Sequence, residues 1–269
     1  MRFIARMPRQ LGGCRFDCSL HEEMERQVFF AGCYAAQEIA FLRHVLKPGM
    51  SFVDVGAAWG LFALVAAHQV GRSGTVIAFE PDPRMLAKLK ANIERNNLTN
   101  THVCNVAVAD REGELRLVVC EQVPGWKFAQ LSTCDATDDA GLSVRSRRLD
   151  TVLDEAGARN VDLVKIDVEG AEDLVLTGMR AGLSNWRYRN ILLELHPLQL
   201  ASRGRTAREV AEGLMAQGYR GYAVDESDAA ARKAYYRPWL HFSEFIRPLD
   251  IERVEIFPHT LWRSPEQAH

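Results

Sequence analysis

Short apolar runs alternate with helical patterns between about residues 47 and 196, and this alternation sets the expected fold. The continuous apolar runs predict strands at residues 51–55, 75–80, 101–108, 161–168 and 190–196. Strands of this composition are typical of a parallel sheet that is covered by helices on both faces. Helical patterns follow the first two strands, at residues 61–70 and from Pro83 to about Asn96. The chain is therefore predicted to be an α/β protein with a doubly wound, mostly parallel sheet and right-handed crossovers.

The segments outside this alternation give the expected domain organisation. Residues 1–46 are expected to form a helical N-terminal extension, and residues 47–200 the α/β core. Within the core, residues 110–150 begin with a hairpin signal and continue into a polar stretch that we interpret as a loop. Residues 201–269 are expected to complete the sheet and to end in a tail. One helix and two strands are predicted there, at about 206–217, 221–224 and 253–257.

The composition is that of an ordinary globular protein and excludes several classes. Of 269 residues, 47% are hydrophobic and 25% are charged, which excludes collagen-like and wholly disordered chains. A net charge of -2 gives no overall basic field, so we expect no nucleic-acid partner. No apolar run reaches the ~18 residues of a membrane span, and no apolar secretory signal is present. We therefore expect no membrane association and a cytoplasmic location, with reduced cysteines that bind no metal.

The first candidate site is the turn at residues 54–60, which joins the first strand to the following helix. Gly56 allows a sharp turn and lets a ligand approach where no Cβ stands in the way, and the N–H groups at the helix start face that ligand. The glycine spacing is G-x-x-x-G, and Ala58 stands where the dinucleotide fingerprint needs its second glycine. This spacing disfavours a nicotinamide or flavin cofactor. A tight turn without any ligand is the alternative.

The second candidate is Glu80, which ends the second strand and is followed by Pro81. An acidic side chain at this position can accept hydrogen bonds from both hydroxyls of a ribose. Each hydrogen bond to an ionised acceptor contributes roughly 1.5–3 kcal/mol. The glycine turn and Glu80 together predict a nucleoside site. Asp54 is expected either to anchor the turn or to accept hydrogen bonds from the backbone N–H groups of the loop.

Charged side chains gather at the ends of the fourth and fifth strands. Lys165, Asp167 and Glu169 share one face of an extended strand, and Glu194 and His196 share a face of the next. Unpaired charge is costly to bury, so these groups are expected either to pair with one another or to serve a ligand. A histidine beside carboxylates can act as a general base near neutral pH. A histidine that is simply hydrogen-bonded at a strand end is the alternative.

Taken together and in this order, the motifs resemble the FkbM family of S-adenosylmethionine-dependent methyltransferases. The resemblance covers about residues 46–197 and is carried by LKPGMSFVDVGAAWG, FEPDP, NVAVAD, LDTVLDEAG, VDLVKIDVEGAE and ILLELHP. It implies a seven-strand, Rossmann-like class I methyltransferase sheet and S-adenosyl-L-methionine as the cofactor. It also implies that the glycine turn lies against the methionine and ribose, that Glu80 binds the ribose diol, and that Val106 and Ala107 lie near the adenine. The expected cofactor-binding residues are Asp54, Gly56, Ala57, Ala58, Trp59, Gly60, Glu80, Pro81, Val106, Ala107 and Asp167.

One position departs from the family pattern. The family commonly reads GANxG at the turn, and this chain has Ala58 in place of Asn. An Asn side chain would bridge the loop and the cofactor, whereas Ala cannot, so we expect modestly weaker binding at the same location. Trp59 is expected either to cover the cofactor or to pack on the helix.

The resemblance implies O-methylation of a hydroxyl on a small molecule, either a sugar or a polyketide-type natural product. Methyl transfer from a sulfonium requires in-line alignment, and an oxygen acceptor must lose a proton. We predict that Asp167 or His196 takes this proton and that Glu169 and Glu194 orient the substrate or the base. Lys165 belongs to the same expected catalytic set.

Several alternatives stay open on the sequence. They are an N-methyltransferase that acts on an amine or peptide, a non-catalytic module that only binds the cofactor, and an RNA methyltransferase. A divalent ion held by Asp167, Glu194 and His196 is a further alternative to the expectation of no metal. Residues 1–46 and 110–150 are expected to cover the substrate, and a homodimer is compatible with the sequence. Candidate lining residues of that cover are Phe29, Phe30, Tyr34, Trp126 and Phe128.

Overall fold

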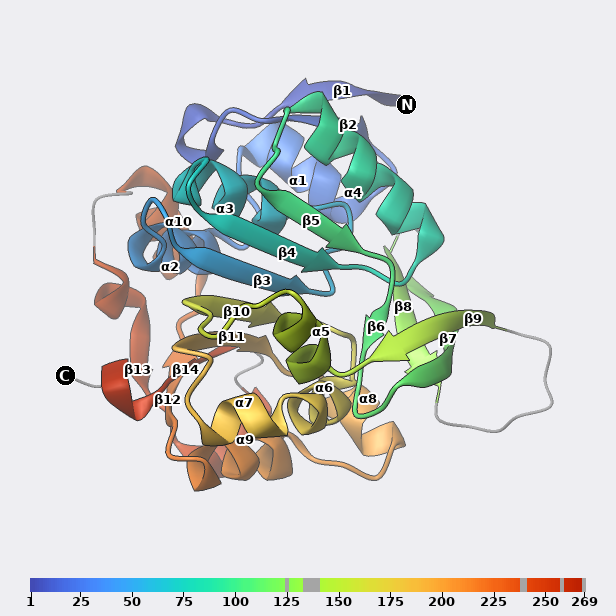
Figure 1. The fold of residues 1–269 in the computed structure, drawn as a ribbon. Helices are drawn as coiled ribbons and strands as arrows, with labels where there is room; N and C mark the ends of the chain where they lie inside the picture. Colours follow the sequence, from blue (N-terminus) through green and yellow to red (C-terminus); the bar gives the residue numbers. More distant parts are fainter. Residues whose placement is uncertain (124–125, 133–140, 238–240, 257–258, 268–269) are drawn as a thin grey trace.

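An eight-stranded sheet runs through the centre of the computed structural model, with helices on both of its faces (Figure 1). The structure describes residues 1–123, 126–132, 141–237, 241–256 and 259–267. The strand order is β13-β12-β14-β11-β10-β3-β4-β5. The parallel part comprises β3 (Ser51–Val55), β4 (Thr75–Phe79), β5 (Thr101–Cys104), β10 (Leu163–Ile166) and β11 (Asn190–Glu194). The predicted doubly wound, mostly parallel sheet is confirmed.

The C-terminal segment completes the sheet beyond β11. Strand β14 (His259–Arg263) runs antiparallel to both β11 and β12 (Arg220–Val224). The short strand β13 (Ile246–Pro248) pairs with β12 at the edge. This edge strand brings the sheet to one strand more than the expected seven.

Strand side chains alternate between two hydrophobic cores. On β4, Val76 and Ala78 face one core, while Ile77 and Phe79 face the other. The first core packs against α2 (Ala36–Val45), α3 (Leu61–Val70) and α4 (Pro83–Arg95). The second packs against α5 (Leu149–Glu155), α6 (Glu172–Gly178), α7 (Arg180–Ser184) and α9 (Ala207–Ala216). Burial on both faces explains why these strands read as continuous apolar runs.

Local signals set the ends of the long helices. Asp82 caps α4 by accepting a hydrogen bond from the backbone N–H of Arg84, and Pro83 occupies the first turn, where its missing N–H costs nothing. Thr206 and Glu209 form a capping box at the start of α9. The predicted helices at 61–70, 83–96 and 206–217 are therefore confirmed within one residue at each end.

A second, four-stranded sheet stands beside the carboxyl ends of the main strands (Figure 1). It contains β6 (Ala107–Val108), β7 (Gly113–Val123), β8 (Trp126–Ser132) and β9 (Leu142–Arg147). The hairpin signal at 111–113 does lead into β7, but the strands on either side of it, β6 and β7, are not neighbours, because β9 lies between them. The hairpin instead joins β7 to β8, further along the chain. The predicted single strand at 101–108 is wrong, because the chain leaves the main sheet after Cys104 and pairs with β9 from Ala107. Most of the predicted polar loop, at 133–140, lies outside the described residues.

The N-terminal extension is only partly helical, which corrects the expectation for residues 1–46. It begins with an antiparallel pair, β1 (Arg2–Arg6) and β2 (Arg15–Ser19), before α1 (Glu23–Ala31) and α2. Phe16 and Cys18 are fully buried, whereas Arg15 is exposed. This period-two alternation is the strand signal that the helical interpretation overlooked.

The strand predicted at 253–257 is also wrong. The chain forms a 3-10 helix over Ile251–Ile256, and the sheet strand comes later, at β14. Asp250 starts the turn, because its side chain accepts a hydrogen bond from the backbone N–H of Glu252. Within the turn Val254 is the buried residue, so the segment has too few inward-facing apolar side chains for a strand. The remaining helices are α8 (Pro197–Ser202) and α10 (Asp228–Tyr236).

No helix within the described ranges combines the length and the apolar character that a bilayer span requires.

Candidate active site

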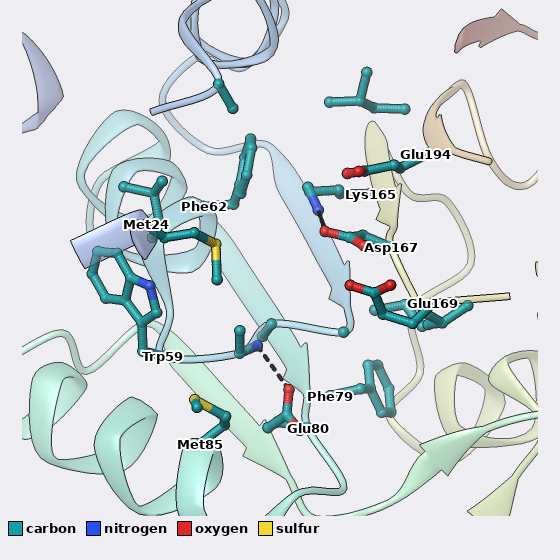
Figure 2. A pocket seen from close by; sticks show the side chains of 18 of the residues that line it. Met24, Trp59, Phe62, Phe79, Glu80, Met85, Lys165, Asp167, Glu169 and Glu194 are labelled. Carbon is teal, nitrogen blue, oxygen red and sulfur yellow. Dashed lines mark hydrogen bonds and ion pairs between the residues drawn. The ribbon is translucent and has the colours of Figure 1, made fainter. Parts of the chain in front are cut away.

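A cavity of about 520 Å³ lies at the carboxyl ends of β3, β4, β10 and β11 (Figure 2). Ligands of open α/β sheets bind in this place. The core contributes the glycine turn, the end of β4 and the charged ends of β10 and β11. The N-terminal segment adds Met24 and Tyr34, the small sheet adds Leu117 and Leu131, and the C-terminal segment adds His259.

The glycine turn is held between β4 and β10. The backbone N–H groups of Gly56 and Ala57 both donate to the Phe79 carbonyl oxygen, at 3.1 and 3.0 Å. On the other side, the Asp167 N–H donates to the Val55 carbonyl oxygen at 3.0 Å. A Cβ on Gly56 would lie 1.8 Å from the Asp167 carbonyl oxygen, and φ is +84°. Only glycine fits this turn, for both reasons.

Glu80 faces the glycine turn. Its Oε2 accepts a hydrogen bond from the Ala58 N–H at 2.7 Å, shown dashed in Figure 2, and its Oε1 accepts one from the Asp82 N–H at 2.8 Å. The carboxylate is buried but lines the cavity, and burial raises its pKa to about 7 against the opposing effect of the two N–H donors. The predicted approach of Glu80 to the glycine turn is therefore confirmed.

Two further residues of the glycine turn, Ala58 and Trp59, have different surroundings. Ala58 has φ +49°, a left-handed conformation that Asn tolerates better than Ala. The backbone therefore supplies a physical reason for Asn at this place in the family pattern. Trp59 stacks on Phe16 with ring centroids 5.1 Å apart and is 1% exposed, so its side chain packs into the core. It still contributes to the cavity wall.

Asp54 and Gly60 do not line the cavity in the part of the chain that the structure describes, unlike the other predicted cofactor-binding residues. Asp54 is 1% exposed and pairs in register with Lys165 on β10. Burial raises the pKa of Asp54 to about 6, although the charge of Lys165 opposes the shift. A Cβ on Gly60 would lie 2.6 Å from Leu89 Cδ1. Asp54 and Gly60 therefore help to fix the shape of the turn from outside the cavity.

The predicted charged residues do come together, because β10 and β11 are parallel neighbours. Lys165 is buried and its Nζ donates to Asp167 Oδ2 at 2.7 Å. His196 Nε2 lies 3.4 Å from Glu169 Oε2, 3.7 Å from Glu194 Oε1 and 3.9 Å from Asp167 Oδ1. Figure 2 shows the three carboxylates side by side on the cavity wall.

A further carboxylate sets the charge of His196. Glu172 is fully buried, and its Oε1 lies 2.9 Å from His196 Nδ1. Burial by itself lowers the pKa of His196, but the hydrogen bond to Glu172 and the charges of Asp167, Glu172 and Glu169 outweigh it and raise the pKa to about 9. An imidazolium has no lone pair to accept a proton. The geometry therefore counts against His196 as a base near neutral pH and favours Asp167.

We expect the stability of the metal-free protein to fall by about 2 kcal/mol between pH 7 and pH 9 because of His196 alone. A histidine with a folded-state pKa of about 9 and an ordinary unfolded value stabilises the fold fully below the unfolded value, and this contribution is lost as pH rises through 9. Urea unfolding at both pH values, with a chelator present, measures the change. In His196→Gln the loss should shrink by this amount, whereas an unchanged loss would contradict the shift. His259, whose pKa is also raised, keeps its own contribution in both proteins.

A second histidine cluster escaped the sequence analysis. His259 Nε2 lies 3.1 Å from Glu194 Oε2 and 3.3 Å from Glu38 Oε1, and its Nδ1 lies 2.8 Å from Glu226 Oε1. All of these residues line the same cavity. The sequence offered a signal for one of these residues, Glu38, because the polar pair Gln37-Glu38 interrupts an apolar helix. Glu226 and His259 carry no local signal, because they come from a distant part of the chain.

The expected lining residues of the substrate cover are partly corrected. Tyr34 lines the cavity. Phe29 and Phe30 are 42% and 70% exposed and pack edge to face on each other, so they belong neither to the cavity wall nor to the core. The side chains of Trp126 and Phe128 lie outside the described residues.

A doubly wound sheet with a glycine turn after its first core strand and a carboxylate facing that turn after its second is the arrangement expected of a class I S-adenosylmethionine-dependent methyltransferase. The protein-family model described as "Methyltransferase FkbM domain" matches residues 54–220. The chain therefore belongs to the FkbM methyltransferase family. The resemblance seen in the sequence motifs is thereby confirmed.

The chain is similar to several named methyltransferases. The chain is 30% identical to 31-O-demethyl-FK506 methyltransferase FkbM of Streptomyces tacrolimicus over 200 residues, which are 64% of this chain and 73% of that protein. It is 29% identical to 2-O-methyltransferase NoeI of Sinorhizobium fredii over 154 residues, 53% of this chain and 62% of that protein. Among solved structures, methyltransferase FkbM from Methylobacillus flagellatus KT superposes with a TM-score of 0.48 at 14% identity, over 84% of this chain and 50% of that one.

Proposed function

We propose that this enzyme transfers a methyl group from S-adenosyl-L-methionine to a hydroxyl group of a small molecule, either a sugar or a polyketide-type compound. The observation that carries the proposal is the position of Glu80, which faces the glycine turn in the cavity that also contains Asp167. The names of the two relatives above, one a 31-O-demethyl-FK506 methyltransferase and the other a 2-O-methyltransferase, support an oxygen acceptor.

The residues of the cavity fit the cofactor. The glycine turn lines the cavity beside Glu80, and the Glu80 oxygens have acceptor capacity beyond their two backbone donors. In this proposal Glu80 accepts the ribose hydroxyls, Ala57, Ala58 and Trp59 flank the methionine, and the adenine lies near Val106. The other proposed contacts that line the cavity are Pro81, Ala107 and Asp167.

When bound, the cofactor supplies a methyl group that is already activated as a sulfonium. The protein then has to align the acceptor and remove its proton. Lys165 holds Oδ2 of Asp167, which leaves Oδ1 directed to the His196 side of the cavity. In our proposal the carboxylate of Asp167 accepts the proton of the acceptor hydroxyl. In the same proposal Glu169 and Glu194, whose carboxylates lie 3.4 and 3.7 Å from His196 Nε2, orient the acceptor.

The segments outside the core supply much of the remaining wall. Met24 and Tyr34 come from the N-terminal segment, and Leu117 and Leu131 come from the small sheet. This supports the proposal that residues 1–46 and 110–150 cover the substrate. The C-terminal segment contributes as well, through Glu226 and His259, which was not expected. A homodimer and the absence of a nucleic-acid partner stay predictions.

A labelling experiment tests the reaction. The purified chain is incubated with methyl-labelled S-adenosylmethionine and a metabolite extract, and labelled products are identified by mass spectrometry. We expect the label in an ether. Label in a methylated amine would instead support the N-methyltransferase alternative, and no labelled product together with no cofactor binding would contradict the proposal.

Asp167→Asn is expected to lower turnover by about 10²–10⁴-fold, the usual contribution of a positioned general base. The amide keeps the shape of the side chain but cannot accept the proton. The amide oxygen can still accept a hydrogen bond from the cofactor, so cofactor affinity, measured by calorimetry, should fall far less than turnover. The loss should therefore appear mainly in kcat. Glu255→Gln is the matched control, because Glu255 is an exposed carboxylate on the 3-10 helix Ile251–Ile256. Full turnover in Asp167→Asn would remove Asp167 from the mechanism.

A further inference from the structure

We propose that Asp167, Glu169 and His196 bind a hard divalent cation of the Mg²⁺ or Mn²⁺ type at the cavity wall. The catalytic meaning of this ion rests on the function proposed above. Binding of the ion itself is a separate property, because it can be measured without cofactor or acceptor.

The three side chains offer their ligand atoms to a common point. One carboxylate oxygen of Asp167, one of Glu169 and one imidazole nitrogen of His196 all lie within 4.8 Å of one another. In an octahedral site with ligand distances of about 2.1 Å, adjacent ligand atoms are about 3.0 Å apart and opposite ones about 4.2 Å. Small side-chain rotations are therefore enough to gather the three atoms around one ion.

Each ligand atom is directed by a neighbour that holds the other end of its side chain. Lys165 Nζ takes Asp167 Oδ2, so Oδ1 is the oxygen that faces His196. Glu172 holds His196 Nδ1 at 2.9 Å and is itself fixed by the Gly170 N–H at 2.9 Å. A bound ion would replace the proton that Nε2 carries in the metal-free protein, and this proton is released to water. With Nδ1 donating to Glu172, the lone pair of Nε2 then points toward the carboxylates.

The pairing of His196 with Glu172 is an independent sign of a metal ligand. Metal-binding histidines almost always donate their second ring N–H to a carboxylate, a carbonyl or water, which fixes the ring and its tautomer. Glu172 is fully buried, and it contacts the imidazole from the side opposite to Asp167 and Glu169. A buried carboxylate in this position has no part in holding the cofactor or the acceptor in the function proposed above.

The backbone conformation at Glu169 also supports an ion site. Glu169 has φ +52°, a left-handed conformation that costs a non-glycine residue roughly 1–2 kcal/mol. Strain of this kind persists at functional sites, where the surrounding structure enforces it. Gly170 follows with φ +98°, and a Cβ there would lie 2.3 Å from Gln199 Cβ. The strained turn directs the Glu169 carboxylate to His196 Nε2.

The ligand set selects the type of ion. Two carboxylates and one imidazole, with Glu194 Oε1 3.7 Å from the same nitrogen, form an oxygen-rich site that suits Mg²⁺ or Mn²⁺ rather than a thiolate-seeking metal. An ion here would also offset the excess of carboxylates over cationic groups around His196. Bound to the acceptor oxygen, it would lower the pKa of that hydroxyl.

Mn²⁺ is the probe for the test. The purified full chain is stripped with a chelator and dialysed, and Mn²⁺ is titrated while the resonance signal of the free ion is recorded. We expect one Mn²⁺ per chain, which excess Mg²⁺ displaces, and a nitrogen coupling from His196 in the pulsed spectrum. Glu169→Gln and His196→Gln should abolish binding, and Glu172→Gln should weaken it by about 10–100-fold.

His259→Gln is the matched control, because it removes the other imidazole of the same cavity by the same substitution. It should bind Mn²⁺ as the wild type does. Circular dichroism and S-adenosylmethionine binding are measured on every variant, so that unfolding is recognised. If the wild type binds no Mn²⁺ at millimolar concentration, or if Glu169→Gln and His196→Gln bind it normally, the ion site is wrong. In either case, cofactor binding by the same metal-free samples tests the proposed function separately.

Discussion

Gly56→Ala is expected to weaken S-adenosylmethionine binding by at least about 100-fold, or about 2.7 kcal/mol. The new Cβ would lie 1.8 Å from the Asp167 carbonyl oxygen, which is a backbone atom at the end of β10 and cannot move alone. The turn would have to leave β10, and the Gly56 and Ala57 hydrogen bonds to Phe79 would be strained or lost. The free energy of unfolding should fall as well, because φ +84° is unfavourable for alanine.

Gly157→Ala is the control for backbone strain without the collision. Gly157 has φ +68°, and no atom lies within 4 Å of the place where its Cβ would stand. This variant should lose roughly 1–2 kcal/mol of stability and keep its cofactor affinity. Calorimetry of cofactor binding and urea unfolding are measured on both variants. Wild-type affinity in Gly56→Ala would show that the cofactor binds away from the turn.

Glu80→Ala is expected to weaken cofactor binding by tens- to hundreds-fold, or about 2–3 kcal/mol. The variant removes the proposed acceptor of the ribose hydroxyls and leaves the Ala58 and Asp82 N–H groups without their partner. Glu80→Gln keeps the shape but places an NH₂ group against one backbone donor, so its affinity should be intermediate. Glu94→Gln, an exposed carboxylate on α4, controls for the change in charge.

A cofactor analogue separates direct contact from a loosened turn. S-adenosylhomocysteine and its 2′-deoxy form are compared on the wild type and on Glu80→Ala by calorimetry. If Glu80 accepts the ribose hydroxyl, removing both partners should cost less than the two single losses added together. Strictly additive losses would mean that Glu80 acts only through the turn.

The sequence identified the parts of the site that lie next to a clear local pattern. Gly56, Glu80 and Asp167 each follow an apolar strand, and the carboxyl ends of parallel strands meet at one edge of a sheet. Once the alternation of strands and helices was recognised, the sequence predicted that these three residues lie close together. The N-terminal hairpin was missed because its period-two pattern is short and interrupted.

The sequence alone could not predict the charge state of His196 or the contact between Glu38 and His259 in the cavity. His196 was one of the two predicted bases, with Asp167 the other, but Glu172, from α6, raises the pKa of His196. Two residues that are distant in sequence, Glu38 and His259, meet across the cavity. A pKa depends on burial and on every charge nearby, and neither quantity can be read from neighbours along the chain.

The amino-acid order by itself therefore determined the α/β architecture, the glycine turn and the acidic strand ends, because hydrophobic period and turn chemistry are local properties. Only the tertiary structure decided which side chains line the cavity, that the pKa of His196 is raised, and that Asp167, Glu169 and His196 converge within 4.8 Å. These features arise from contacts between distant segments, whose geometry depends on how the whole sheet and its covering segments pack.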